Sequence, residues 1–386
     1  MPTLTEDDIY RTSTQYRLWS FTKASLESLR STTNATAADG VRVAIKKRRP
    51  EHAKADQDDK SSAEVDCLTV EEEQRLVGYY CLKAMQFADF AGLPTNVKAT
   101  AVQFMKRFYL TNSPMTYHPK EIMLTALFLS TKTENNYISL AKFASKFEKT
   151  TQDDVIAPEF LLTQGLRFTF DVRHPYRGLE GGYMELLALA KGNGTSSSDD
   201  SDLSVKLQKM MMQTEPAKSE GETQGSVQQT IQRLEKSKSM AQDILKTSAL
   251  LTDAYFLYTP SQIWLSALFL ADESLVCFYL DAKFPTPSPL KPKLISTIQS
   301  CVELLGSSPS AKPKEAEVSQ LRKIDKKLYM CRNPEKIDLI GINKAQKREG
   351  SENGLDEKVI KKRKMEREQQ EKEAEDVFGP AIAAKR

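Results

Sequence analysis

The sequence predicts an all-α protein with two tandem helical domains of five helices each and an extra helix at each end. Apolar residues between positions 68 and 306 recur mostly at the spacing of amphipathic helices. One segment also occurs twice, 141 residues apart, as Pro119–Ser130 and Pro260–Ala271, with seven of twelve positions identical. Both copies begin with proline, which suits the first turn of a helix. Two copies are too few for a solenoid, so we expect two domains, each wrapped around one buried helix.

Length, charge and cysteine content argue against several classes of protein. A chain of 386 residues can bury two hydrophobic cores. Its 55 basic and 52 acidic residues give a net charge of only +3, so direct nucleic-acid binding is not expected. No run of 18 apolar residues occurs, so no membrane contact is expected either. The five cysteines are odd in number and form no Cys-x-x-Cys pair, which argues against a disulfide framework or a zinc site.

The N-terminal part is predicted to contain a helix within residues 1–31, with Trp19 and Phe21 as large apolar anchors. A surface linker is expected over 32–66, where the apolar pattern fades. This linker contains the basic cluster 46–50, Lys-Lys-Arg-Arg-Pro, which has two interpretations. It is either a solvated loop or a nuclear-import or phosphate-contacting segment.

The first domain is expected over residues 67–172. Thr69 and Glu72 have the spacing of a capping box at the start of its first helix. Pro94 suits the first turn of the second helix, on which Lys106 is expected to face away from the core. The third helix is apolar nearly all round and should be central. The last three helices are predicted over 119–132, 139–147 and 153–166.

The second domain is expected over residues 173–308. It contains a polar stretch, about 191–226, whose composition predicts a disordered insertion. Helical periodicity returns from Val227 to about Gly306, and a C-terminal helix is predicted within 309–335. The remaining residues, 336–386, are charged and predict a disordered tail.

Catalytic chemistry has no support in the sequence. The three histidines, His52, His118 and His174, lack an evident orienting partner, so structural roles are expected. Gly178, Gly181 and Gly182 lack the Gly-Lys-Ser/Thr ending of a phosphate loop. We therefore expect no catalytic residues, no cofactor and no metal site, and a protein that is not an enzyme.

Several segments resemble a known family. Ala101-Val-Gln-Phe-Met-Lys-Arg-Phe-Tyr-Leu and the residues up to Thr125 resemble the second and third helices of a cyclin box, specifically that of the cyclin H family. Ala249–Ile263, the inter-domain run His174–Arg177 and the N-terminal Gln15–Thr22 resemble corresponding parts of that family. The resemblance spans most of residues 10–330 apart from the insertion.

The resemblance implies tandem cyclin boxes and a regulatory subunit that binds and activates a cyclin-dependent kinase in the nucleus. In that family the kinase phosphorylates other cyclin-dependent kinases and the C-terminal repeats of RNA polymerase II, in transcription and cell-cycle control. The implied partners are the kinase catalytic subunit, a RING-finger assembly subunit and the TFIIH core.

The resemblance also implies a kinase-binding site. Lys132 is similar to the lysine that ends the third helix of a cyclin box, and Glu159 to its partner glutamate on the fifth. Neighbouring positions that resemble kinase-facing ones are Leu129, Thr133, Phe160, Thr163, Phe168 and Phe170. The Met-Arg-Ala-Ile-Leu docking patch of cell-cycle cyclins is absent, because Val70–Leu76 stands in its place.

Two alternatives remain. The chain could be another transcriptional cyclin, serving an elongation or Mediator kinase. It could instead be a double cyclin-fold promoter-binding factor of the TFIIB kind, although the zinc ribbon and strongly basic face of such factors are not evident in the sequence.

Overall fold

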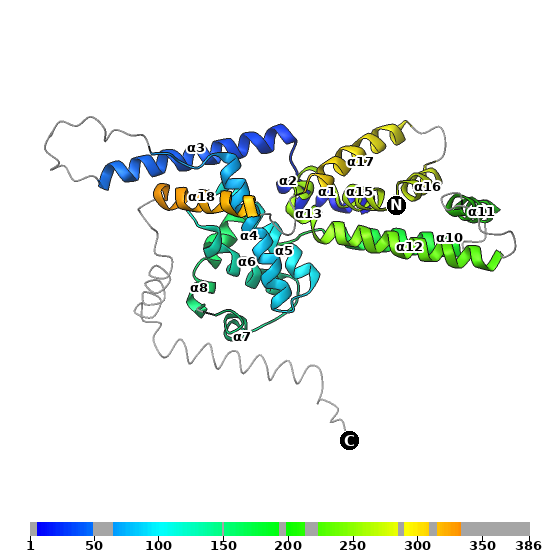
Figure 1. The fold of residues 1–386 in the computed structure, drawn as a ribbon, viewed down its shortest axis with the longest axis horizontal. Helices are drawn as coiled ribbons and strands as arrows, with labels where there is room; N and C mark the ends of the chain where they lie inside the picture. The colour runs from blue at the N-terminus through cyan, green and yellow to red at the C-terminus, as the bar shows by residue number, and fades with distance from the viewer. Residues whose placement is uncertain are drawn as a thin grey trace, which may run out of the picture. The chain divides into compact units, whose positions relative to one another are not determined.

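The structure is a computed structural model, and it describes residues 6–48, 65–148, 150–192, 198–212, 223–284, 289–308 and 315–332. All regular secondary structure in these ranges is helical, which confirms the predicted all-α class (Figure 1). The described ranges belong to one compact unit, Met1–Lys336. Within them, no helix combines the length and the apolar character that crossing a bilayer would require.

Three helices precede the first domain: α1 (Glu6–Thr12), α2 (Thr14–Trp19) and α3 (Lys23–Arg48). Trp19 is 1% exposed, which agrees with its predicted role as an anchor. Its indole N–H donates to the hydroxyl of Thr169, 2.9 Å away, and so joins α2 to the end of the first domain.

The predicted linker over 32–66 is wrong in its first half, because α3 continues as a helix to Arg48. Ala38, Val41 and Ala44 lie three residues apart and are all buried. Ala38 and Val41 pack in one cluster with residues of α4 and α18. Tertiary packing of this small apolar stripe stabilises the helix although Asp39 and Gly40, which lie between its members, have low helix propensity. The basic cluster begins at the end of α3, and the rest of it lies outside the described residues.

The first domain contains six described helices. They are α4 (Val70–Phe90), α5 (Thr95–Thr111), α6 (Pro119–Thr133), α7 (Leu140–Ala144), α8 (Gln152–Ile156) and α9 (Glu159–Gly165). The capping box at α4 is confirmed: the Thr69 hydroxyl accepts from the Glu72 N–H, and the Glu72 carboxylate accepts from the Thr69 N–H. Helix α6 is the central one, buried along most of its length and packed against α4, α5, α8 and α9.

The helix predicted over 153–166 is interrupted at Ala157 and Pro158, so it forms α8 and α9 instead. Proline has no N–H to donate, so Pro158 cannot form the hydrogen bond to the carbonyl of the residue four positions earlier that would continue the helix. The break makes Glu159 the first residue of a new helix, which matters for the candidate site described below.

The second domain consists of eight described helices. They are α10 (Tyr176–Ala190), α11 (Ser198–Met212), α12 (Thr223–Lys246), α13 (Ser248–Leu251), α14 (Ala254–Leu257), α15 (Pro260–Ala271), α16 (Glu273–Lys283) and α17 (Leu290–Gly306). Helix α15 is the repeat of α6 and packs against α10, α12, α16 and α17. Its Trp264 side chain lies directly over Gly178 and Gly182 of α10, where a Cβ atom would come within 2.5 and 2.7 Å of the indole.

The predicted disordered insertion over 191–226 is wrong in part, because α11 and the start of α12 lie within it. Leu207 of α11 is fully buried, and α11 packs against α10, α12 and α16. Burial of this apolar face against three helices offsets the entropy cost of ordering α11, although the polar composition of the stretch predicted disorder. Residues 193–197 and 213–222 of this stretch lie outside the described ranges.

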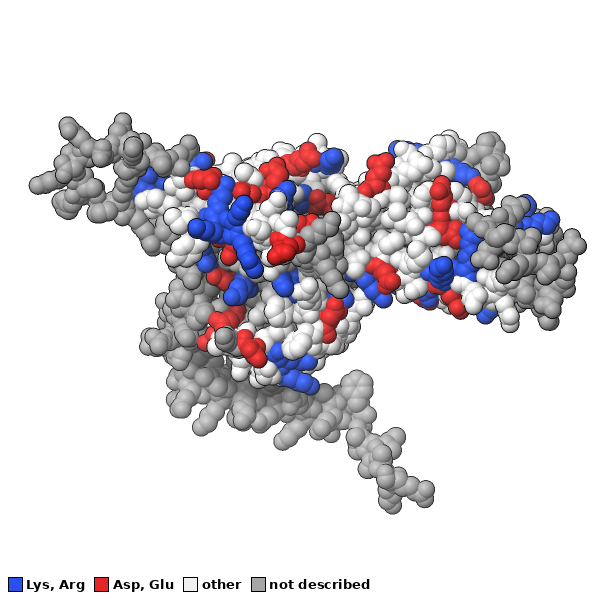
Figure 2. All heavy atoms as spheres, in the orientation of Figure 1, with Lys and Arg blue, Asp and Glu red and all other residues white. Residues whose placement is uncertain are grey.

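The predicted C-terminal helix is present as α18 (Glu315–Cys331). It packs against α4 through Ile324 and Leu328, and its Lys327 forms ion pairs with Asp66 and Glu72, both at 2.9 Å. On the face drawn in Figure 2, Lys and Arg side chains are interspersed with Asp and Glu, apart from a basic group over α18. The predicted tail lies outside the described residues.

Candidate functional site

The ion pair between Lys132 and Glu159 is at the centre of the candidate site. Lys132 lies in the last turn of α6 and Glu159 in the first turn of α9, and the Lys132 ammonium contacts the Glu159 carboxylate. Each charge is at the helix end whose macrodipole favours it. The Lys132 ammonium also lies 4.5 Å from the centre of the Phe128 ring.

Both side chains remain accessible, with 39% of Lys132 and 20% of Glu159 exposed. An accessible ion pair contributes only about 0–1 kcal/mol to stability. The pair therefore contributes little to holding the fold.

Apolar and hydroxyl side chains flank the ion pair. Phe160 and Phe168 are each 61% exposed, which is unusual for large aromatic residues. The N–H of Phe168 donates to the carbonyl of Thr163, and the Thr163 hydroxyl donates to the carbonyl of Glu159, so hydrogen bonds connect these three residues. Thr133 is half-buried beside Lys132.

One of the predicted site residues lies in the interior and another is partly buried. Leu129 is only 6% exposed and belongs to the core of the first domain. Phe170 is partly buried, with its ring 6.2 Å from that of Phe104. Of the other six predicted residues, Lys132, Phe160 and Phe168 are exposed, and Thr133, Glu159 and Thr163 are half-buried.

The backbone around Phe168 is held in an uncommon conformation. Arg167 and Phe168 have φ angles of 54° and 56°, in the left-handed region that residues other than glycine rarely adopt. The Arg167 guanidinium lies 5.5 Å from the centre of the Trp19 ring, and Thr169 accepts the indole hydrogen bond. The N-terminal helix α2 therefore supports the turn that exposes Phe168.

The connection between the two domains contains a second group of polar residues, which are linked by hydrogen bonds. The two ring nitrogens of His174 contact the hydroxyls of Thr100, at 2.8 Å, and Tyr255, at 3.0 Å. The Thr100 hydroxyl donates in turn to the carboxylate of Glu134 at 2.6 Å. Burial, followed by the nearby charge of Arg107, lowers the pKa of His174 to about 3. The ring of His118 accepts a hydrogen bond from the N–H of Lys120 at the start of α6. Both histidines thus have side-chain partners that are not evident from the sequence, and His52 lies outside the described residues.

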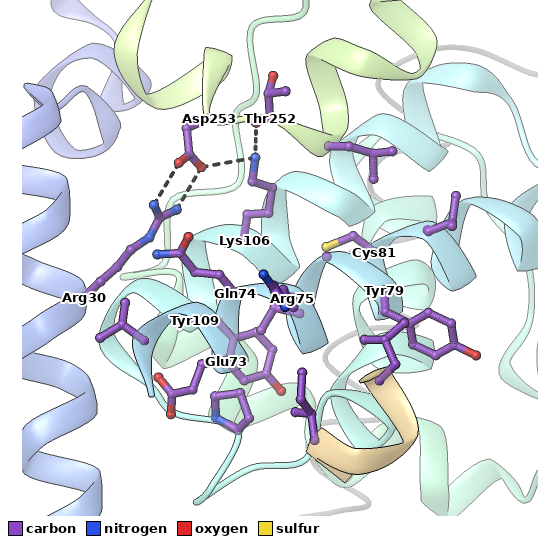
Figure 3. Close-up of a pocket in the computed structure, with 18 of the residues that line it drawn as sticks. Arg30, Glu73, Gln74, Arg75, Tyr79, Cys81, Lys106, Tyr109, Thr252 and Asp253 are labelled. Carbon is purple, nitrogen blue, oxygen red and sulfur yellow. Dashed lines mark hydrogen bonds and ion pairs between the residues drawn. The ribbon is translucent and has the colours of Figure 1, made fainter. Parts of the chain in front are cut away.

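The sequence-based expectation for Lys106 is wrong, because this side chain points into the junction of the two domains (Figure 3). Its ammonium donates to the carbonyl of Thr252 and lies 3.6 Å from the carboxylate of Asp253. Arg30 of α3 forms a bidentate pair with the same carboxylate, with two contacts of 2.8 Å. The sequence contains no short-range signal for this charged cluster, since Arg30, Lys106 and Asp253 are 76 to 223 residues apart.

The electrostatics of this junction follow from burial. Burial lowers the pKa of Lys106, against the opposing effect of Asp253. Burial alone would raise the pKa of Asp253, but hydrogen bonds from Arg30 and the charge of Lys106 outweigh it and hold the pKa at about 2. The cluster borders a cavity of about 530 Å³ among α3, α4, α5, α13, α17 and α18.

No group of three potential metal ligands among His, Cys, Asp and Glu is assembled within the part of the chain that the structure describes. The five cysteines are free thiols, and Cys81, Cys301 and Cys331 are buried. Burial raises the pKa of these three thiols, so each behaves as a small apolar side chain.

Family models match both domains. The cyclin N-terminal domain model matches residues 71–171, and the cyclin C-terminal domain model matches residues 174–306. The candidate site, centred on the end of α6 and the start of α9, lies within the first match.

Three cyclins from other organisms are similar to this chain in sequence. Cyclin CCL1 of Saccharomyces cerevisiae is 36% identical over 284 residues, which cover 73% of this chain and 63% of that protein. Cyclin mcs2 of Schizosaccharomyces pombe is 32% identical over 330 residues, covering 85% of this chain and 86% of that protein. Cyclin-H of Xenopus laevis is 31% identical over 181 residues, covering 45% and 52% respectively.

Solved structures agree with the sequence comparison. The chain is similar to a chain of the CAK complex of Chaetomium thermophilum bound to ATP-gamma-S, with a TM-score of 0.71 and 33% identity over 92% of this chain and 98% of that one. It is also similar to a chain of the yeast TFIIK complex of Kin28, Ccl1 and Tfb3, with a TM-score of 0.54 and 31% identity, covering 77% and 100%.

Proposed function

Since the chain belongs to the cyclin family, with both cyclin domains present, we propose that it is the regulatory subunit of a CDK-activating kinase. In this proposal it binds a cyclin-dependent kinase and activates it, and it has no catalytic activity of its own. The observation that carries the proposal is the 33% identity, over 92% of this chain, with a chain of the CAK complex.

The partner surface in this proposal is centred on Lys132 and Glu159. Phe160 and Phe168 supply exposed apolar area beside the ion pair. Exposed aromatic residues of this kind provide much of the affinity at protein interfaces, while charged pairs set orientation. A stable assembly of this sort buries on the order of 2,000 Å² or more in total.

Activation follows from differential binding. A protein kinase requires an ion pair between the lysine that holds the nucleotide phosphates and a glutamate on its C-helix. A rigid surface that fits only the inward position of the C-helix shifts the kinase toward the active state by the difference in affinity. The well-packed core around α6 makes the end of that helix such a rigid surface.

The remaining partners are part of the same proposal. The yeast TFIIK complex contains Tfb3 besides the kinase Kin28 and the cyclin Ccl1. By analogy, this chain would assemble with a RING-finger subunit and the TFIIH core, act on the RNA polymerase II C-terminal repeats, and work in the nucleus.

Co-purification tests the proposal and its site together. Affinity-tagged protein should retain a cyclin-dependent kinase, identified by mass spectrometry, and Lys132→Glu with Glu159→Lys should lose it while remaining folded. The matched control is Lys238→Glu with Glu180→Lys, because Lys238 also pairs with a glutamate, at 2.8 Å, and also lies over an aromatic ring. Retention of a Mediator or elongation kinase instead would overturn the assignment, and retention by the Lys132/Glu159 variant would overturn the site.

A further inference from the structure

Three hydrogen bonds link the second domain to the end of α6. They connect Tyr255 of α14 to His174 in the inter-domain connection, His174 to Thr100 of α5, and Thr100 to Glu134, at 3.0, 2.8 and 2.6 Å. The ring of Tyr176 stacks on the ring of His174, with the ring centres 5.5 Å apart. We call this chain of four polar residues, Tyr255, His174, Thr100 and Glu134, the relay.

The donor and the acceptor of each hydrogen bond in the relay can be assigned. A carboxylate accepts but does not donate, so the single hydroxyl hydrogen of Thr100 is directed at Glu134. The Thr100 oxygen then accepts the hydrogen of His174 Nε2, which leaves Nδ1 as the acceptor for the Tyr255 hydroxyl. Every group in the relay is therefore satisfied only when His174 is neutral and carries its hydrogen on Nε2.

The relay ends at the residue that terminates α6. Glu134 is the C-cap of α6, with its N–H bonded to the Ser130 carbonyl at 3.0 Å. The next residue, Asn135, has a φ of 54° and turns the chain away from the helix. Lys132 lies two residues before Glu134, so the position of the Glu134 side chain and that of the last turn of α6 are coupled.

The ion pair alone holds this last turn weakly. Lys132 is 39% exposed, and accessible ion pairs contribute little because solvent screens them. Thr100, in contrast, is completely buried, and its bond to Glu134 is a hydrogen bond to a charged acceptor, which is stronger than one between neutral groups. The relay is thus a firmer polar attachment than the ion pair at this end of the helix, which is also packed into the core through Leu129.

We propose that Thr100 is a positioning residue: through Glu134 it fixes the last turn of α6, and hence Lys132, in the orientation that the partner kinase recognises. This inference rests on the proposed function. It assigns a role in kinase binding to a buried residue that itself touches no partner, and it makes the second domain, through Tyr255 and His174, a support for the binding surface of the first.

The first test needs no kinase. Thr100→Val keeps the shape of the side chain but removes the hydroxyl. In the full chain it should speed hydrogen exchange of the amides of Glu134 and Asn136, which bond to the last turn of α6, by roughly five- to tenfold, as the loss of one such hydrogen bond implies. The control is Ser266→Ala, which removes another fully buried hydroxyl, within α15. Equal exchange rates at Glu134 and Asn136 in Thr100→Val and wild type would overturn the proposal.

The second test is a double-mutant cycle on binding to the purified kinase. Thr100→Val and Lys132→Ala should each weaken binding by about fivefold or more, and the double variant should be little worse than Lys132→Ala alone. Tyr255→Phe, at the far end of the relay, should weaken binding in the same direction. A purely structural role for Thr100 predicts additive losses, and additivity would contradict the proposal.

The cycle also separates this inference from the proposed function. If Lys132→Ala does not weaken binding, the proposed kinase site is wrong. If Lys132→Ala weakens binding while Thr100→Val does not, the site stands and the positioning role of Thr100 is wrong.

Discussion

Lys132 and Glu159 come from different helices, and each lies at the helix end where its charge is favoured, so their ion pair joins the end of α6 to the start of α9. The pair exists in this form because Pro158 interrupts the helix predicted over 153–166. Without the break, Glu159 would lie in the middle of a helix, where the dipole of a helix N-terminus would not act on it. A backbone interruption thus shapes the surface on which the proposed function depends.

The exposed ring of Phe160 should contribute to partner binding and not to folding. Phe160→Ala is expected to weaken kinase binding about tenfold or more, because exposed aromatic residues beside a charged pair are frequent hot spots. The free energy of unfolding should change by no more than about 0.5 kcal/mol. Phe90→Ala is the matched control, since Phe90 is 76% exposed at the end of α4. Calorimetric titration of both variants with the kinase checks the prediction; equal affinities would contradict it.

The charged junction of Arg30, Lys106 and Asp253 should be essential for stability. Asp253→Asn leaves two largely buried cations without their counter-charge, which is expected to lower the free energy of unfolding by about 3 kcal/mol. Asp281→Asn, at a carboxylate that is 62% exposed, should cost no more than about 1 kcal/mol. Denaturant titration of both variants measures the difference, and similar losses would show that the junction is not a stabilising centre.

His174 should make stability depend on pH below neutrality. Its pKa is about 3 in the folded protein against an ordinary value of 6.5, so between these pH values only the unfolded state binds the proton. The free energy of unfolding therefore falls as the pH is lowered through this window, by up to about 1.4 kcal/mol per pH unit, and the contribution is fully retained above pH 6.5. The groups around the ring are Thr100, Tyr255, Tyr176 and Arg107.

Comparison with His174→Gln isolates this contribution from that of the carboxylates. Between pH 7 and 5 the stability of the wild type should fall more steeply than that of the variant. Parallel curves from denaturant titrations at several pH values would contradict the assignment of a neutral, buried imidazole.

The contact of Trp264 with α10 should tolerate no side chain at Gly178. A Cβ atom there would lie 2.5 Å from the indole, so Gly178→Ala is expected to cost about 1–3 kcal/mol through overpacking. Gly181→Ala, on the same helix with nothing within 4 Å, should be neutral or stabilising by up to about 1 kcal/mol. Thermal unfolding of the two variants checks the prediction, and equal destabilisation would rule out the steric explanation.

The sequence predicts the central elements well because they have strong periodicity. The repeat around Pro119 and Pro260 correctly identifies the two central helices, and the Thr69 capping box correctly marks the start of α4. The predictions fail where stability comes from contacts distant in sequence. Helix α3 depends on a stripe of small residues such as Val41, and α11 on burial of Leu207.

Contacts between residues distant in sequence also explain which features of the functional site the sequence does not predict. Resemblance to a family selects Lys132 and Glu159, but it does not reveal that Leu129 is largely buried. Lys106 has the spacing of an exposed residue and is nevertheless buried, because its partners are 146 and 147 residues further along the chain. Tertiary partners of this kind leave no local pattern from which they could be predicted.

Activation of a purified kinase tests the central claim most directly. The rate of phosphate transfer to an RNA polymerase II C-terminal repeat peptide should be measured with the monomeric catalytic subunit of a CDK-activating kinase, alone and with increasing amounts of this chain. Our account predicts a saturable increase in rate with the wild type and none with Lys132→Glu/Glu159→Lys. An unchanged rate at saturating wild-type protein, or equal activation by the charge-reversed variant, would contradict it.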